Sequence, residues 1–185
     1  MPHEHKHEIF CAGRAGKLIG FLRRLTQNPF GILRPYLKEG MTVLDFGSGP
    51  GFFSVPAAKI VGPSGKIYAV DVQQNMLDML VKYAEKKGVL GNIVTINNPE
   101  HDVGIEMSAD VILVIYVAHE VPDREKLFLN LKKRLKPDGI ILLSEPKHVV
   151  SESEFKETLG IAEKCGFKVA GKMKMMRSWT AVLKQ

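Results

Sequence analysis

Residues 42–54 read TVLDFGSGPGFFS, an apolar run that ends in three glycines at alternate positions. Gly47, Gly49 and Gly51 permit a tight turn and let a ligand approach the backbone where any Cβ would clash. Dinucleotide-binding turns have the spacing G-x-G-x-x-G instead, and their third glycine would fall on Phe52. The stretch therefore predicts a β-strand followed by a ligand-binding turn, of a kind other than the dinucleotide fingerprint.

Two acidic residues accompany this turn. Asp45 stands two residues before Gly47, and Asp71 ends the β-rich run 66–70, KIYAV. A carboxylate at Asp45 would repel a pyrophosphate but attract a ligand with ammonium and sulfonium groups, and S-adenosylmethionine carries both without a phosphate. A carboxylate at the tip of the second strand can accept hydrogen bonds from both ribose hydroxyls. The two acids therefore favour S-adenosylmethionine.

Through the turn and these acids, residues 28–184 resemble the class I S-adenosylmethionine-dependent methyltransferases, most closely their small ubiquinone-biosynthesis-like branch. That family has a first motif acid-x-G-x-G-x-G, met here by Asp45 to Gly51, and an acid that ends the second strand, met by Asp71. The resemblance implies an α/β fold: a three-layer, Rossmann-like, doubly wound sheet of seven strands, mostly parallel with the last strand antiparallel. It implies methyl transfer as the activity.

The pattern along the rest of the chain is consistent with this fold, because strands and helices alternate. Helices are predicted over 52–61, 74–87, 123–135 and 151–165, strands over 93–96, 110–116 and 140–144, and final β-rich runs over 167–173 and 175–183. Asp123 and Ser151 are expected to cap their helices, Ser151 in a capping box with Glu154. KPDG at 136–139 is predicted to be a turn, and the last two runs are too close for a parallel crossover.

Length and composition limit the domain organisation. The 185 residues are expected to form a single domain, 1–185, with an N-terminal lid over 1–41 and a cofactor-binding core over 42–185. Two cysteines cannot make a disulfide framework, and no apolar run approaches the ~20 residues of a membrane span. The opening MPHEHKHEIF lacks the apolar region of a signal peptide, so a cytoplasmic location is expected.

The net charge of +6 is concentrated in the two flanks of the chain. Residues 1–40 have seven Lys or Arg and three acids, residues 151–185 have seven and four, and residues 41–150 have twelve and thirteen. Basic flanks suit an anionic substrate, a nucleic acid or a membrane surface. A solvated basic surface is the alternative, since no aromatic residues interleave with Arg14, Lys17, Arg23 and Arg24.

Cofactor contacts are expected beyond the carboxyl ends of the strands, where open α/β sheets bind ligands. We expect the turn to hold the methionine end of the cofactor and Asp71 to hold the ribose, while the other residues in the following list contact the adenine or the sulfonium. The predicted contacts are Asp45, Gly47, Ser48, Gly49, Gly51, Asp71, Val72, Met76, Asn98 and Tyr116. Ordinary core packing is the alternative for Val72 and Met76, and a turn role before Pro99 is the alternative for Asn98, which replaces an acid found in many relatives.

Catalytic candidates follow the fourth and fifth strands: His119, Glu145 and Tyr116. A histidine titrates near working pH and suits a general base. A structural histidine and a glutamate in a surface loop are the alternatives. Methyl transfer itself requires alignment and exclusion of water, and a base is needed only if the acceptor must lose a proton.

The acceptor is predicted to be a small organic molecule. Residues 115–120 read IYVAHE, without the N/D-P-P-Y/F run of nucleic-acid amino methylation. The alternatives are an RNA acceptor on the basic flanks, a non-catalytic cofactor-binding module and, more distantly, an NAD oxidoreductase.

The sequence leaves a homodimer open. His3, His5, His7 and Cys11 are not expected to form a functional metal site, because alternate residues of an extended tail point to opposite sides.

Overall fold

The computed structural model describes residues 27–98 and 106–185. The predicted lid residues 1–26, with the four candidate metal ligands, and Pro99 lie outside the described residues. The elements are α2 Pro29–Leu33, β1 Thr42–Phe46, α3 Ser54–Val61, β2 Lys66–Asp71, α4 Gln74–Lys87, η1 Leu90–Asn92, β3 Ile93–Asn97, β4 Ala109–Ile115, η2 Ala118–Glu120, α5 Arg124–Arg134, β5 Leu135–Pro146, α6 Glu152–Lys164, β6 Lys168–Gly171 and β7 Ser178–Lys184.

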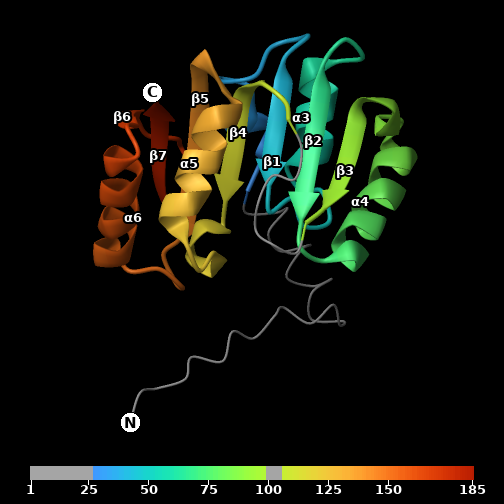
Figure 1. The fold of residues 1–185 in the computed structure, drawn as a ribbon. Helices are drawn as coiled ribbons and strands as arrows, with labels where there is room; N and C mark the ends of the chain where they lie inside the picture. Colours follow the sequence, from blue (N-terminus) through green and yellow to red (C-terminus); the bar gives the residue numbers. More distant parts are fainter. Residues whose placement is uncertain (1–26, 99–105) are drawn as a thin grey trace.

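One seven-stranded sheet in the order β3-β2-β1-β4-β5-β7-β6 forms the middle layer (Figure 1). The strands β1 to β5 pair in parallel with one another, whereas β7 runs antiparallel to both β5 and β6. The predicted fold, with its reversed last strand, is confirmed. Strand order reverses between β1 and β4, so the carboxyl ends of these two strands mark the crevice where ligands of doubly wound sheets bind.

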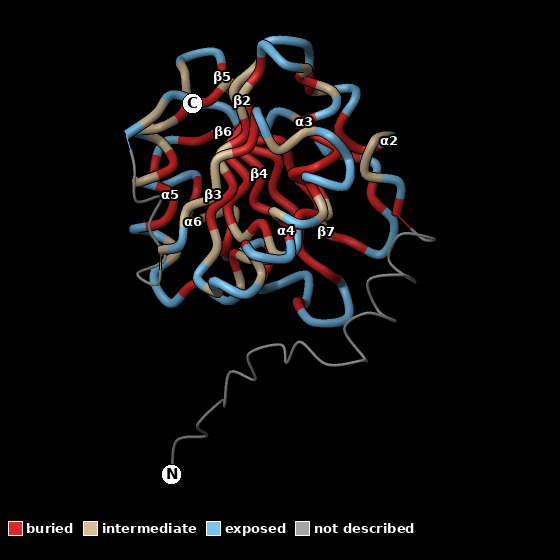
Figure 2. Tube along the Cα trace, turned by 90° about the vertical axis from the view of Figure 1, so that its right-hand side faces the viewer, coloured by how far each residue is buried: buried red, intermediate tan, exposed pale blue. Residues whose placement is uncertain are grey.

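Two apolar clusters cover the two faces of the sheet. On one face α2, α3 and α4 contribute buried residues such as Leu33, Val55 and Leu80. On the other face α5 and α6 contribute residues such as Phe128 and Phe155. Figure 2 shows the strands buried between helices whose outer sides are exposed. Successive residues of a strand therefore face different layers, which decides below on which side of the sheet each site residue lies.

Local capping chemistry sets several helix ends as predicted. The Asp123 side chain accepts a hydrogen bond from the Lys126 amide at 2.8 Å, at the start of α5. Ser151 and Glu154 form the reciprocal capping box of α6. Gly88 ends α4 in the left-handed conformation. These signals act within a few residues, which explains why the sequence alone locates them.

The start of β5 differs from the prediction. Ala109 pairs with Leu135 and Val111 with Ile140, so residues 136–139 form an irregularity within the strand rather than a turn that precedes it. Leu135 is buried, and this side chain brings the chain into the sheet as soon as α5 ends. The last two strands are also shorter than the β-rich runs, because residues 172–177 form the connection between them.

Candidate functional site

The glycine turn leaves β1 at its carboxyl end and is fixed to β2 by backbone hydrogen bonds. The amides of Gly47 and Ser48 both donate to the Val70 carbonyl, at 2.9 Å each. Gly47 has a φ of 75°, and a Cβ there would lie 2.5 Å from Cγ2 of Val117, after β4. Gly47 is therefore required both by its left-handed backbone and by the close approach of the segment after β4.

Gly49 has open space around its Cα, unlike Gly47. Its φ of 52° is also left-handed, but a Cβ would meet nothing within 4 Å. Its amide donates to Oδ2 of Asp71 at 2.8 Å. The turn thus approaches the tip of β2 while leaving open space above Gly49.

Asp71 is oriented by two backbone amides. In addition to the bond from Gly49, the backbone N–H of Gln73 donates to Oδ1 of Asp71 at 2.9 Å. Each carboxylate oxygen has a further lone pair, so the oriented group can still accept from a ligand. This geometry suits the predicted ribose contact.

Asp45 is more deeply buried than expected for a residue whose charge attracts the cofactor. Its side chain is 3% exposed, and its Oδ2 accepts a hydrogen bond from the Ser54 hydroxyl at the start of α3. The carboxylate thus connects β1 to α3 beneath the turn. Its predicted contact with the methionine end stays a prediction.

Ser48 tests whether the turn fits a ligand. Ser48 is 6% exposed. Among the buried side-chain oxygen and nitrogen atoms of the described residues, only its Oγ lacks a hydrogen-bond partner. An unsatisfied buried hydroxyl costs about 1–3 kcal/mol. A polar group bound on the turn would relieve this cost. Together with Asp71 and the space above Gly49, this fits a polar cofactor.

The predicted adenine contacts lie around the ends of β2 and β3. Val72 is 39% exposed, so core packing does not account for it, and Met76 is half-buried in the first turn of α4. The backbone N–H of Asn98 donates to the backbone carbonyl of Asp71 at 3.1 Å. Sequence reasoning missed Asn97, whose side chain donates to the carbonyls of Asp71 and Val72 at 3.2 and 3.1 Å and fixes the backbone that carries Asp71, the predicted ribose contact.

His119 and Glu145, predicted separately, form one pair. His119 lies in η2 after β4, and Glu145 is near the carboxyl end of β5. His119 Nδ1 lies 2.6 Å from Glu145 Oε2, and the His119 amide donates to Oε1 at 3.1 Å. The Glu145 side chain is 1% exposed, whereas that of His119 is 24% exposed. Glu145 is therefore not in a surface loop, and the pair presents the imidazole to solvent.

The same contact changes the proton affinity of the imidazole. The hydrogen bond with Glu145 raises the pKa of His119, burial opposes the rise, and the charges of Glu145, Glu120 and Glu154 add to it. Because Nδ1 faces a carboxylate, the neutral ring carries its proton there and leaves Nε2 as the lone-pair nitrogen. Glu120 Oε1 lies 3.9 Å from Nε2.

Tyr116 lies on the opposite face of the sheet from this pair. Its φ is 64°, an uncommon conformation for a tyrosine, and its amide donates to the Ser144 carbonyl at 2.8 Å. The phenol oxygen lies 2.5 Å from Ser178 Oγ and accepts from Gln27 Nε2 at 2.6 Å. The hydroxyl thus joins the ends of β4 and β7 to the segment before α2. Neither Gln27 nor Ser178 carries a motif that could have predicted this.

No trio of His, Cys, Asp or Glu able to hold a metal ion occurs in the two described ranges. Likewise, none of the helices in these ranges has the length and apolar character needed to span a bilayer.

This arrangement can be compared with known proteins. A family described as "Methyltransferase domain" matches residues 37–182. The chain belongs to this methyltransferase family. Among solved structures, an S-adenosylmethionine-dependent methyltransferase from Aquifex aeolicus superposes with a TM-score of 0.79 and 27% identity, over 90% of this chain and 95% of that one. The predicted class I family and its cofactor, S-adenosylmethionine, are thereby confirmed.

Curated relatives include two kinds of methyltransferase. The ribosomal protein L11 methyltransferase of Dictyoglomus turgidum is 31% identical over 156 residues, 83% of this chain and 47% of that protein. The ubiquinone/menaquinone biosynthesis C-methyltransferase UbiE of Haemophilus ducreyi is 30% identical over 110 residues, 59% of this chain and 42% of that protein. The methyltransferase described here thus spans about half the length of these relatives.

Proposed function

We propose that this protein methylates a small organic acceptor, with His119 as general base and Glu145 as the residue that positions it. The 2.6 Å contact between His119 Nδ1 and Glu145 Oε2, at the edge of the sheet that also carries the glycine turn, supports the proposal most directly. A buried carboxylate that orients a partly exposed imidazole is the arrangement that a proton-accepting histidine needs.

The cofactor-binding residues proposed are those of the turn and the tip of β2. Asp71 would accept from the ribose hydroxyls, and the Ser48 hydroxyl would gain the partner it lacks. When bound, S-adenosylmethionine supplies an electrophilic methyl group on its sulfonium. Val72 and Met76 would pack on the adenine, with Asn98 beside it.

The base acts on the acceptor rather than on the cofactor. The lone pair of Nε2 would take up the proton that the nucleophilic atom of the acceptor loses as it gains the methyl group, and the electron pair of the broken sulfur–carbon bond would stay on the sulfur. The resulting imidazolium donates from Nδ1 to the Glu145 carboxylate, which lowers the energy of the charged ring. Positioned proton transfer of this kind contributes a factor of ~100 to 10,000.

The acceptor class can be tested by incubating the protein with labelled S-adenosylmethionine and a fractionated cell extract. Label in the small-molecule fraction, lost in His119→Ala and retained in His148→Ala, is the expected result. His148 is an exposed histidine after β5 and serves as the matched control. Label that enters small molecules at an unchanged rate in His119→Ala would contradict the base assignment.

Label in the RNA fraction would support the alternative of an RNA acceptor, and two other outcomes would also change the proposal. The similarity to an L11 methyltransferase favours protein as the second candidate acceptor, which label in the protein fraction would reveal. Tight cofactor binding without label in any fraction would indicate a binding module. The cytoplasmic location, the homodimer and the single domain over 1–185 stay predictions.

A further inference from the structure

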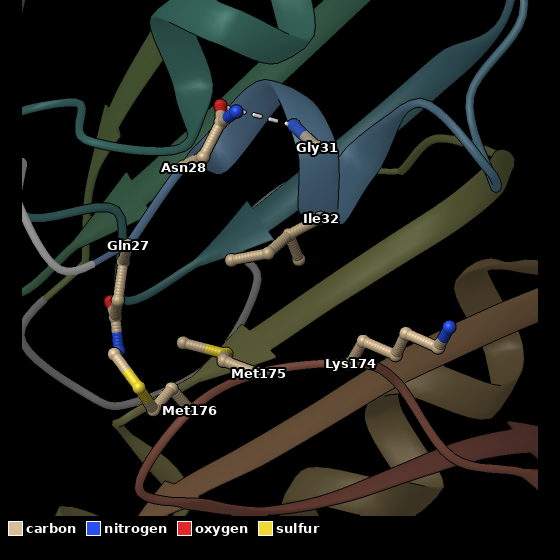
Figure 3. A pocket seen from close by; sticks show the side chains of 7 residues that line it. All are labelled: Gln27, Asn28, Gly31, Ile32, Lys174, Met175 and Met176. Carbon is tan, nitrogen blue, oxygen red and sulfur yellow. Dashed lines mark hydrogen bonds between the residues drawn. The ribbon is translucent and has the colours of Figure 1, made fainter.

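A cavity of about 230 Å³ lies between α2 and the segment before β7, on the face of the sheet opposite to the His119–Glu145 pair (Figure 3). Ile32 and Met175, which line this cavity, belong to the apolar cluster of the α2 face. Glu145 points to the other face, because Leu143, two residues before it in β5, belongs to the cluster that α5 and α6 cover. The side chains that surround the proposed base are therefore those of the α5–α6 face.

Trp179 lies beside Glu145 on that face. The two residues are partners in the antiparallel pairing of β5 with β7. Partners of this kind have their side chains on the same face, with Cβ atoms about 4.5–5.5 Å apart. Because β5 lies between β4 and β7 in the sheet, Glu145 has His119 on the β4 side and Trp179 on the β7 side. The half-buried indole thus covers the flank of the carboxylate that His119 leaves open.

Three contacts fix the orientation of the indole. Its Nε1–H donates to the Val150 carbonyl at 2.9 Å. The ring stacks on Phe155 of α6, with centroids 6.3 Å apart and planes at 20°, and Nζ of Lys147 lies 4.1 Å from the ring centroid. The N–H is the only polar donor of an indole, and here it is bonded to Val150. Trp179 therefore presents apolar carbon to Glu145.

The carboxylate of Glu145 depends on His119 for its hydrogen bonds. Within the described residues, the imidazole bonds to its Oε2 and the backbone N–H of His119 bonds to its Oε1. The Glu145 side chain is 1% exposed. A buried carboxylate interacts strongly with a close partner, because water neither competes for its oxygens nor screens its charge. Apolar cover beside Glu145 thus strengthens the contact that orients the imidazole.

We propose that Trp179 is a positioning residue of this site: its indole excludes water from Glu145, and Glu145 in turn holds the imidazole of His119 with Nε2 toward the acceptor. The inference rests on the proposed function for its effect on turnover and on the geometry of the α5–α6 face for the orientation of the imidazole. It gives a role to the single tryptophan of the chain, which no sequence motif indicates.

Other charges near His119 come from η2 and α6. Glu120 Oε1 lies 3.9 Å from Nε2, and the charge of Glu154 adds to the rise in the pKa of His119. Both of these carboxylates belong to exposed residues, whereas Glu145 is buried. Substitution of Trp179 keeps all three acids in the chain, and it uncovers only the buried one.

An NMR titration of the His119 imidazole tests the inference without any acceptor. Trp179→Ala should move the titration toward lower pH, because water would weaken the contact with Glu145, and Trp179→Phe should retain it, because a benzene ring keeps the cover. In a Glu145→Gln background Trp179→Ala should cause no further change, since no carboxylate is left to shield. An unchanged titration in Trp179→Ala, a move toward higher pH, or an equal move in both backgrounds would overturn the inference.

Phe167→Leu controls for the loss of a large apolar side chain. Phe167 belongs to the same apolar cluster but precedes β6, at the opposite end of β7 from Trp179. This variant should lower the free energy of unfolding without moving the titration of His119. A titration that moves equally in Phe167→Leu would assign the effect to general loosening of the core and overturn the inference.

The emission of Trp179 provides a second measurement, which needs no substitution of the indole. Because the chain has one tryptophan, its fluorescence reports this position alone. The emission should change with pH in step with the titration of His119, lose this change in His119→Gln and keep it in His148→Ala. Emission that does not follow the His119 titration would show that the indole is not beside the pair.

Kinetics separate this inference from the proposed function. Trp179→Ala should lower kcat about 10- to 100-fold, the scale expected for a misplaced reacting group, with the KM for S-adenosylmethionine within a few-fold. Trp179→Phe should recover most of the rate. If the titration moves as expected but His119→Ala is fully active, the proposed function fails and the role of Trp179 in orienting the imidazole stands. If His119→Ala is inactive but Trp179→Ala changes neither the titration nor kcat, the inference alone fails.

Discussion

The two halves of the carboxyl edge are built in different ways. In what we propose as the cofactor half, at the ends of β1, β2 and β3, backbone groups take part in the contacts that hold the turn and Asp71: two amides of the turn reach the Val70 carbonyl, and the backbone amides of Gly49 and Gln73 orient Asp71. In what we propose as the acceptor half, at the ends of β4 and β5 and the start of β7, side chains also contact one another, as in His119 with Glu145 and Tyr116 with Ser178.

This difference predicts that the two halves respond differently to substitution. Backbone contacts depend on φ angles and glycines, so many sequences can keep the same cofactor half. Side-chain contacts change with a single substitution, so the acceptor half can be altered while cofactor binding is retained. Four measurements test this division.

The largest effect is expected from His119→Ala. Turnover should fall by ~100-fold or more, because positioned proton transfer is lost, while cofactor affinity stays within a few-fold. Steady-state kinetics and calorimetry on the same variant measure the two quantities. A loss of cofactor affinity as large as the loss of turnover would show that the two halves are coupled, which would contradict the division between them.

Asp71→Ala should have the reverse effect. Loss of hydrogen bonds to a charged acceptor, worth about 1.5–3 kcal/mol each, should weaken cofactor binding at least tenfold. Turnover at saturating cofactor should change little. Asp78→Ala, at an exposed acid of α4, is the control for removing a negative charge. Cofactor binding that survives Asp71→Ala would remove Asp71 from the site.

Gly47→Ala and Gly49→Ala compare two positions of one turn. Both place alanine at a positive φ, a cost of about 1–2 kcal/mol. Only Gly47→Ala also forces a Cβ against Val117, which should add about 1–3 kcal/mol of destabilisation. Denaturant unfolding of the two variants gives the difference directly. Equal destabilisation would mean that the segment after β4 moves away easily and does not hold the turn.

The smallest effect concerns pH. Because the pKa of His119 is raised above about 6.5, activity should decline as pH falls through that raised value. In Glu145→Gln an imidazole titration by NMR should move toward lower pH. The pH dependence of stability has the opposite sign. Because the pKa of His119 is higher in the folded state, protonated His119 stabilises the folded protein fully below a pH of about 6.5, and this contribution is lost as the pH rises through the pKa of the folded state. An unchanged titration in Glu145→Gln would show that Glu145 does not set the pKa.

The same division explains what could be predicted from sequence. The turn, Asp71, the limits of α4 and the caps at Asp123 and Ser151 depend on residues close in the chain. The pairing of His119 with Glu145 joins residues 26 apart, and the contact of Gln27 with Tyr116 joins residues 89 apart. No local pattern reports such contacts.

The irregularity at 136–139 was missed for a related reason. KPDG has the composition of a turn, but pairing of Leu135 with Ala109 keeps the segment in the sheet. Asp45 shows a different limit. Its position in the motif was predicted, but its burial against Ser54 could be known only from the packing of α3 on β1.

The pre-oriented carboxylate of Asp71 has a consequence for how the enzyme would respond to its own product. The ribose is the same before and after methyl transfer, so a contact made there favours the spent molecule as strongly as the fresh one. Binding energy of this kind does not speed the reaction, and it delays departure of the product. The rate inside a cell would then follow the ratio of methyl donor to demethylated product rather than the donor concentration alone, which makes the turnover of this protein dependent on how quickly other enzymes clear that product.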